Sequence, residues 1–213
     1  MHYSGAVYRP PSEAYSLIVQ VTLGCSHNKC AFCNMYKAKK FAITPIEQVM
    51  EDLQWARKQY RRIERIFLAD GDALILPTEH LMGILDYIRE NFPECERVAT
   101  YASPRSILGK TPEDLKRLRE AGLSMAYLGL ETGNEELLKK INKGVSVTQQ
   151  IECGRKLKEA GMILSVTAIN GLAGANGDWR SHAIDTAHAL NAMRPDYIAL
   201  LTQYLQETFD RGG

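Results

Sequence analysis

Short apolar runs alternate with longer amphipathic stretches along this chain of 213 residues. Each apolar run is bounded by polar residues, glycine or proline, which is typical of strands buried on both faces of a sheet. The stretches between the runs carry apolar residues at helical spacing. The pattern predicts six strands, at residues 17–23, 66–69, 97–101, 125–130, 163–169 and 197–201.

Capping residues mark the starts of several helices between these strands. Thr44 predicts an N-cap, Pro45 the first helical position and Glu47 the acidic partner of a capping box. Thr111 and Ser146 predict two further N-caps, because each hydroxyl can accept a hydrogen bond from a free amide of the first turn. These signals place helices directly before or after the predicted strands.

Other helices are identified by their ends or by their length. Gly122 and Gly161 each follow an alanine at a predicted helix end, where glycine can adopt the left-handed conformation that terminates a helix. Further helices are predicted near residues 78–90 and 178–193.

Regular alternation of strands and helices predicts parallel strands joined by right-handed crossovers. Six such units can form a doubly wound sheet or a partial (β/α)6 TIM-like barrel. No Gly-x-Gly-x-x-Gly follows the first strand, so the dinucleotide-binding form of the doubly wound sheet loses support. In both α/β architectures functional loops follow the carboxyl ends of the strands.

Composition adds few constraints. Twenty-six basic and 25 acidic residues give a net charge of +1, which indicates no overall attraction to nucleic acids or membranes. No apolar run approaches the roughly 18 residues of a membrane span, and residues 1–5 lack the features of a secretory leader. Five cysteines, with three of them clustered, do not indicate a disulfide framework, so we expect a reducing cytoplasm.

We expect a single domain over residues 1–213. Residues 202–213 are too few and too weakly patterned to predict a helix that covers the last strand. Exposed sheet edges promote unwanted pairing with other chains. Two explanations therefore stay open: the chain is truncated after the sixth strand, or another chain covers this edge.

Three cysteines within ten residues carry the clearest chemical signal. Cys25, Cys30 and Cys33 lie on the loop that follows the first predicted strand. Three thiolates can ligate three irons of a cubic iron–sulfur cluster, which leaves a fourth iron open to a small molecule. A closed zinc site with His27 as the fourth ligand is the alternative. An electron carrier without further chemistry also stays open.

The cysteine loop resembles that of the radical S-adenosylmethionine (radical SAM) superfamily. The family's usual spacing is Cys-x3-Cys-x2-Cys, and this chain has one additional residue in the first gap. Phe32 supplies the aromatic residue that precedes the last cysteine in the family. Asp70, Gly71 and Asp72 follow the second predicted strand, where family members carry a Gly-Gly-Glu-like turn.

Two later segments support the same resemblance. Residues 129–144 resemble the strand-four segment of the branch that contains the elongator protein, methylthiotransferases and coproporphyrinogen dehydrogenase. Residues 169–174 resemble that branch's Ile-x-Gly-Leu-Pro-Gly turn, with Ala173 in place of the proline. The segments occur in register with the first, second, fourth and fifth predicted strands.

The resemblance implies a partial barrel that holds a 4Fe–4S cluster on the three clustered cysteines and S-adenosylmethionine on the open iron. It further implies an enzyme that cleaves S-adenosylmethionine reductively to a 5′-deoxyadenosyl radical, which abstracts hydrogen from an unidentified substrate. Such an enzyme needs a reductant of the flavodoxin or ferredoxin type. The alternative is an iron–sulfur carrier or zinc module without radical chemistry.

The resemblance also implies a set of cofactor-binding residues. Asp70 or Asp72 would meet the methionine amino group, Glu131 the ribose, and Lys143 the methionine carboxylate. A solvated turn is the alternative for the two aspartates, and a buried ion pair is the alternative for the glutamate. The complete implied set is Phe32, Asp70, Gly71, Asp72, Ser103, Glu131, Lys143 and Asn170.

The remaining cysteines and charges predict little chemistry. Cys95 and Cys153 belong to no second cluster motif, and we interpret them as packing residues. The other histidines show no metal-ligand spacing. RNA as a substrate stays open, through Lys37, Lys39 and Lys40 beside the cysteines, but it is not favoured. A second basic group indicates a solvated face and comprises Arg57, Lys58, Arg61, Arg62 and Arg65.

Overall fold

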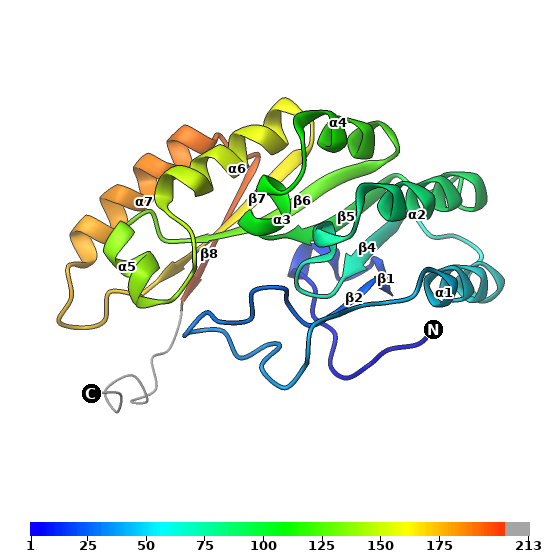
Figure 1. The fold of residues 1–213 in the computed structure, drawn as a ribbon, viewed down its shortest axis with the longest axis horizontal. Helices are drawn as coiled ribbons and strands as arrows, with labels where there is room; N and C mark the ends of the chain where they lie inside the picture. The colour runs from blue at the N-terminus through cyan, green and yellow to red at the C-terminus, as the bar shows by residue number, and fades with distance from the viewer. Residues whose placement is uncertain (203–213) are drawn as a thin grey trace.

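The computed structural model describes residues 1–202 and contains six parallel strands in one open sheet (Figure 1). The strands lie in consecutive order across the sheet. Because the order never reverses, right-handed crossovers place the connecting helices on one face, which gives a partial barrel rather than a doubly wound sheet. The strands, in that order, are β1 (Leu17–Gln20), β4 (Arg65–Ala69), β5 (Arg97–Ala102), β6 (Leu123–Glu131), β7 (Ile163–Asn170) and β8 (Tyr197–Thr202).

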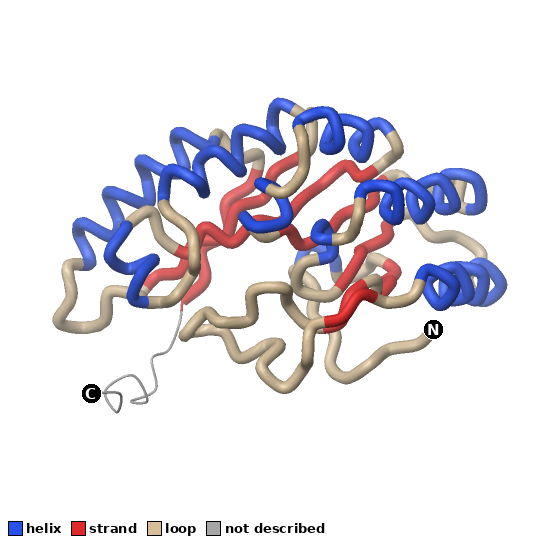
Figure 2. The backbone as a smooth tube through the Cα atoms, viewed as in Figure 1, coloured by secondary structure: helices blue, strands red, loops and turns tan. Residues whose placement is uncertain are grey.

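The helices cover one face of the sheet, and the loop between β2 (Thr22–Leu23) and β3 (Ala42–Ile43) lies on the other side (Figures 1 and 2). Their apolar faces pack on the sheet in a continuous core that includes Leu53, Leu85 and Leu157. The helices are α1 (Ile46–Gln59), α2 (Thr78–Asn91), α3 (Pro104–Leu108), α4 (Pro112–Glu120), α5 (Glu135–Lys140), α6 (Val147–Glu159) and α7 (Trp179–Met193). Two 3₁₀ turns, η1 (Pro11–Glu13) and η2 (Ala73–Ile75), complete the set.

A smaller aromatic cluster forms the second core of the sheet. Phe67, Tyr101 and Tyr127 come from three adjacent strands and meet edge to face, with ring centroids 5.0 to 6.1 Å apart. The Tyr127 hydroxyl donates to Glu13 Oε1 at 2.6 Å, which ties η1 to β6. Arg97 balances the buried Glu13 carboxylate through a salt bridge of 2.8 Å. The N-terminal segment is thereby fixed against the sheet.

The first predicted strand, residues 17–23, is wrong as a single element. The chain leaves the sheet after Gln20, and β2 (Thr22–Leu23) pairs antiparallel with β3 (Ala42–Ile43). Val21 sits at the change of partner: its amide donates to the Ala69 carbonyl, and its own carbonyl accepts from Thr44. This small hairpin brackets the cysteine loop.

The helix starts agree with the sequence in two of three cases. Thr111 and Ser146 cap α4 and α6 within complete capping boxes. Thr44 is not an N-cap, because its amide bonds to Val21 and the proline that follows keeps it extended, so Pro45 takes the cap position. Gly122 terminates α4 with a φ of +118°, as predicted.

Several features lie outside the sequence predictions. The short helices α3 and α5 were not predicted. Every residue of β8 is exposed, and the prediction about residues 203–213 falls outside the described residues. Within residues 1–202, every helix is too short or too polar to cross a lipid bilayer.

Candidate functional site

The cysteine loop runs from the end of β2 to the start of β3. Cys25, Cys30 and Cys33 are half-buried free thiols on this loop. Burial raises the pKa of both Cys25 and Cys30, and the proximity of Cys33 acts on each of them in the same direction. Within residues 1–202, His, Cys, Asp and Glu side chains form no group of three or more that could share a metal ion, so the thiols are neighbours rather than a converged ligand set.

Three hydrogen bonds attach this loop to the turn after α5. The Ala31 amide donates to the Ile141 carbonyl at 2.9 Å, and the Asn142 side-chain amide donates to the Lys29 carbonyl at 3.2 Å. His27 Nε2 donates to the Asn142 carbonyl at 2.7 Å. Nε2 of His27 is therefore engaged by this turn. The attachment brings residues from two distant segments to one place.

Glu131 and Lys143 meet beside the cysteines. Glu131 is the last residue of β6, and its Oε1 lies 2.7 Å from Lys143 Nζ. The two side chains are 10% and 11% exposed, which identifies the buried ion pair that the sequence left as an alternative. Burial alone would lower the pKa of Lys143, but the Glu131 carboxylate raises it. The same two charges act in opposite directions on the thiol of Cys30.

Asp70 follows β4 and is completely buried. One carboxylate oxygen, Oδ2, accepts hydrogen bonds from Gln20 Nε2 at 2.9 Å, from the Gly24 amide at 3.0 Å and from Lys39 Nζ at 2.8 Å. The other oxygen, Oδ1, is buried without a hydrogen-bond partner among the described residues. Buried carboxylate oxygens normally have partners, so Oδ1 is available to a ligand cation.

Asp72 links the cysteine loop to the helix after β5. Its carboxylate accepts from the Ser26 hydroxyl and from both the amide and the hydroxyl of Ser103, at 3.0 and 2.7 Å. Ser103 also caps α3. Asp70 and Asp72 are both fully buried, so the alternative of a solvated turn is wrong.

Gly71 lets the two walls of the site approach each other. A Cβ added there would lie 2.6 Å from the Tyr36 ring and 3.1 Å from Cys25 Cβ. Only glycine therefore fits between the cysteine loop and β4. Burial strongly raises the pKa of Tyr36, whose hydroxyl has no hydrogen-bond partner in the described part of the chain.

Phe32 and Asn170 lie on the β7 side of the loop. Phe32 packs against a small apolar cluster that includes Leu138, Ile141 and Leu172. Asn170 is the exposed last residue of β7, directly before a glycine with a φ of +87°. The structure thus joins the implied residues into contacting groups around the cysteines, with Asn170 at the exposed rim.

The sequence analysis did not predict three residues that line or stabilise the cysteine site: Tyr36, Lys39 and Asn142. Lys39 was noted only as a basic residue for RNA, but its ammonium binds Asp70 and the Ala6 carbonyl at 2.6 Å. Asn142 has a φ of +55°, a conformation that asparagine tolerates better than most residues. That preference is the one local signal that could have identified it.

The residues interpreted as structural have packing roles. Cys153 is fully buried, and its thiol points to the Pro104 carbonyl at 3.7 Å. His182 is buried and bonds through its two ring nitrogens to Thr132 and Ile169. Neither residue lies on the cysteine loop, so neither enlarges the site.

The donor set fits an iron–sulfur cluster with an organic ligand beside it. Three neighbouring thiols on one loop supply the sulfur ligands that such clusters take from proteins. Asp70 Oδ1 and the Tyr36 hydroxyl are buried beside these thiols and have no hydrogen-bond partner within residues 1–202. These two atoms give a polar ligand unsatisfied groups to bind.

Comparison with known proteins agrees with this site. A sequence model of the Radical SAM superfamily matches residues 19–187. The heme chaperone HemW of Bacillus subtilis is 23% identical over 188 residues, which cover 84% of this chain and 48% of HemW. The hopanoid C-3 methylase of Methylococcus capsulatus is 26% identical over 166 residues, 76% of this chain and 29% of the methylase. The chain thus spans half or less of the length of these two relatives.

Solved structures of other proteins share the fold. The coproporphyrinogen III oxidase HemN of Escherichia coli aligns with a TM-score of 0.67 at 18% identity, over 91% of this chain and 45% of HemN. The radical S-adenosylmethionine methyltransferase TsrM of Kitasatospora setae, solved with cobalamin and a [4Fe–4S] cluster, also gives 0.67 at 18% identity, over 95% of this chain and 40% of TsrM. With the family match over residues 19–187, these findings place the chain in the radical SAM superfamily, whose members use a 4Fe–4S cluster and S-adenosylmethionine.

Proposed function

We propose that residues 1–213 form the core domain of a radical SAM enzyme, with Cys25, Cys30 and Cys33 as the iron ligands. When bound, a reduced cluster would supply the electron that cleaves S-adenosylmethionine to methionine and a 5′-deoxyadenosyl radical, and this radical would abstract hydrogen from a substrate. The reaction class beyond this step and the substrate stay unassigned, because the chain spans only part of its relatives.

One observation carries the proposal: the cysteine loop is bonded to two other segments that follow different strands. The turn at Asn142 holds it from one side, and Asp70 binds the Gly24 amide directly before Cys25. An isolated zinc module or electron carrier needs no such contacts with strand ends. A site that must place a second ligand beside the cluster does need them.

The chain's own residues divide into binding and positioning roles. Asp70 Oδ1 would accept a hydrogen bond from the amino group of S-adenosylmethionine, because this oxygen has no partner within residues 1–202 whereas Oδ2 already accepts from Lys39. Lys143 would bind the carboxylate, because an ammonium has three donors and the bond to Glu131 uses one. Glu131 would accept from the ribose. Asp72 positions Ser26 and Ser103 around the loop.

Phe32, Gly71 and Asn170 complete the proposed binding surface. Phe32 would offer its ring edge to the ligand, Gly71 keeps the β4 wall close to Cys25, and Asn170 would reach the adenine side from the rim of β7. An electron must reach the site from outside. We propose a cytoplasmic flavodoxin or ferredoxin-type reductant for that step.

RNA as the substrate is the less favoured alternative. Lys39 is committed to Asp70, and Lys37 donates to the Asn28 carbonyl at 3.1 Å. Both ammonium groups therefore form hydrogen bonds that stabilise the cysteine loop. Tight, steeply salt-dependent binding of tRNA would nevertheless favour this alternative.

Iron and sulfide content of anaerobically reconstituted protein tests the ligand set. Replacing Cys25, Cys30 or Cys33 with alanine should abolish the cluster, because each removes one of three protein ligands. Cys95→Ala is the matched control, since that half-buried thiol lies away from the loop and should leave iron content unchanged. A full iron complement in any of the three loop variants would contradict the assignment.

A further inference from the structure

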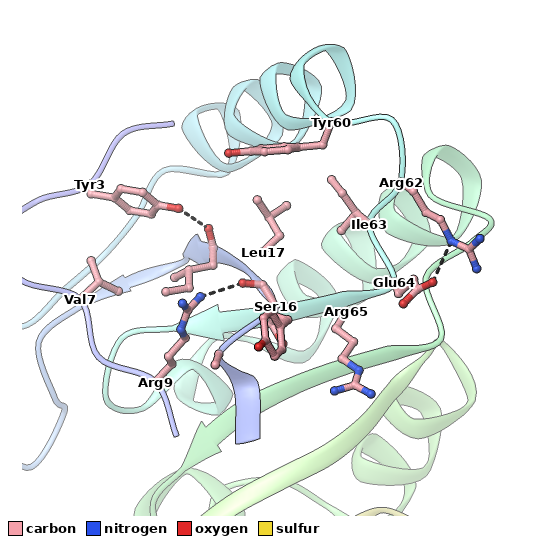
Figure 3. A pocket seen from close by; sticks show the side chains of 13 residues that line it. Tyr3, Val7, Arg9, Ser16, Leu17, Tyr60, Arg62, Ile63, Glu64 and Arg65 are labelled. Atoms are coloured by element: carbon pink, nitrogen blue, oxygen red, sulfur yellow. Dashed lines mark hydrogen bonds and ion pairs between the residues drawn. The ribbon is translucent and has the colours of Figure 1, made fainter. Parts of the chain in front are cut away.

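A pocket of about 620 Å³ opens beside the edge strand β1 (Figure 3). It surrounds the first residues of β1 and β4, whereas the cysteine loop follows the ends of these strands. The N-terminal segment, η1 and the turn between α1 and β4 complete its walls. Its size lies within the usual range of small-ligand sites. None of the residues of the proposed radical SAM site lines it.

Two tyrosines and an apolar floor form one half of this pocket. Tyr3 and Tyr60 are 49% and 48% exposed, so a large part of each ring is available to a ligand. Leu17 and Ile63 lie beside Tyr60 in Figure 3. Tyr3 is fixed by its hydroxyl, which donates to the Ile18 carbonyl at 2.8 Å. Flat aromatic surfaces over aliphatic side chains favour a planar ring as the ligand.

Positive charge collects in the other half. Three arginines and a single acidic residue line the pocket, and in Figure 3 Arg9 and Arg65 lie on the side of Leu17 opposite the two tyrosines. Arg62 is neutralised by Glu64 at 2.8 Å. Within residues 1–202, the Arg9 side chain binds only the neutral Ser16 carbonyl, and the Arg65 side chain forms neither an ion pair nor a hydrogen bond. Two uncompensated guanidinium groups therefore remain for an anion.

The turn that carries Tyr60 is held rigidly. Arg57 donates to the carbonyls of Tyr60 and Arg61 at 2.6 and 2.7 Å, and its other guanidinium nitrogen lies 2.6 Å from Glu94. Glu94 also accepts from the Ile63 amide at 2.9 Å. Groups fixed before binding lose little freedom when a ligand arrives, so these contacts favour binding.

We propose that this pocket binds a nucleoside monophosphate unit, with the base against Tyr60 and Tyr3 and the phosphate in the half of the pocket that carries Arg9 and Arg65. A guanidinium group matches a phosphate through two parallel hydrogen bonds, and tyrosine faces accept any base by stacking. The unit can be a free nucleotide or one residue of a single-stranded RNA. In both cases the tyrosines would contact the base and the arginines would contact the phosphate of one nucleotide.

Calorimetric titration of the full chain with AMP tests the proposal, with adenosine and inorganic phosphate as half-ligands. AMP should bind, and each half-ligand should bind at least about tenfold more weakly, because it lacks one set of contacts. Arg65→Gln should weaken AMP binding about tenfold or more, and Tyr60→Leu should weaken it about fivefold or more. Arg155→Gln is the matched control, since it removes an exposed arginine on α6 outside the pocket.

Two further measurements separate the remaining outcomes. Saturating S-adenosylmethionine should leave AMP binding unchanged, and competition would instead place AMP at the cysteine site and overturn the proposal. A hexamer of riboadenylate that binds more tightly than AMP, and still depends on Arg65, would identify RNA as the source; equal affinity would identify the free nucleotide. Absence of AMP binding, or an Arg65→Gln variant that melts normally and binds as well as the unmodified chain, would contradict the proposal.

Discussion

Lys143 Nζ lies 2.7 Å from Glu131 Oε1, and both side chains are almost completely buried. Glu131 ends β6 and Lys143 lies on the turn after α5, and the charges of both side chains act on the thiol of Cys30. A buried ion pair that loses one partner leaves an uncompensated charge, which costs much more than an exposed pair contributes. The pair is therefore a sensitive probe of the site.

Replacing Glu131 with glutamine should lower the free energy of unfolding by about 3 kcal/mol, because Lys143 would remain charged and buried without its partner. Iron content should stay intact, since no thiol is changed, while turnover of S-adenosylmethionine should fall. Thermal unfolding, iron analysis and detection of 5′-deoxyadenosine measure the three effects. The double variant Glu131→Gln, Lys143→Met should recover part of the stability but not the turnover. Unchanged turnover in the single variant would remove Glu131 from the site.

Replacing Asp70 with asparagine should destabilise the cysteine loop by roughly 3 kcal/mol, because the buried ammonium of Lys39 loses its counter-charge. The iron content should fall as well, since the Asp70 carboxylate also holds Gly24 next to Cys25. Asp86→Asn serves as the control: its ion pair with Arg89 is exposed, and such pairs contribute about 1 kcal/mol or less. Equal melting temperatures and iron contents for the two variants would refute this role of Asp70.

Gly71→Ala should reduce iron loading, because the added methyl group would push Tyr36 and Cys25 away from β4. Gly83→Ala makes the same chemical change within α2, where nothing lies within 4 Å of the new carbon. That control should raise stability by about 0.5–1 kcal/mol, since alanine favours helices over glycine. Iron content and melting temperature of the two variants check the contrast. Normal iron loading of Gly71→Ala would show that the contact is not needed.

Stability at acidic pH should depend on Glu94. Burial alone would raise the pKa of this carboxyl, but hydrogen bonds from amides and from Arg57 lower it from 4.5 to about 2. Because the folded-state pKa is the lower one, the stabilising contribution is present above the unfolded value and is lost as the pH falls from about 4.5 towards 2. Glu94→Gln should flatten this part of the stability profile, measured by thermal unfolding.

Glu96→Gln is the control for the acid profile. Glu96 is an exposed neighbour that forms no ion pair within residues 1–202, so this variant should keep the slope of the unmodified chain. A Glu94→Gln variant with that same slope would show that the contacts of Glu94 do not contribute to acid stability.

The fold was predictable because its signals are local. Buried strands read as short apolar runs, and Thr111 and Ser146 cap helices through residues three positions away. The break at Val21 was not predictable, because its partners, Ala69 and Thr44, are chosen only when the sheet and the hairpin form. The same contact with Val21 explains why Thr44 fails to cap α1.

The site was predictable only in part. The spacing of the cysteines and the segment at residues 129–144 are motifs within short stretches of sequence. The salt bridge of Lys39 with Asp70 joins residues 31 positions apart, and the bond of His27 to Asn142 spans 115 positions. No local pattern marks such pairs, so the roles of Lys39 and Asn142 in holding the loop were not predicted, whereas the three cysteines were proposed as ligands from their spacing alone.

Electron paramagnetic resonance of the anaerobically reconstituted, dithionite-reduced chain tests the central claim most directly. The account predicts the signal of a reduced 4Fe–4S cluster that changes when S-adenosylmethionine is added, because the ligand would occupy the iron that lacks a cysteine. A cluster signal indifferent to S-adenosylmethionine would support an electron carrier instead. Zinc in place of iron, with no cluster signal, would contradict the account altogether.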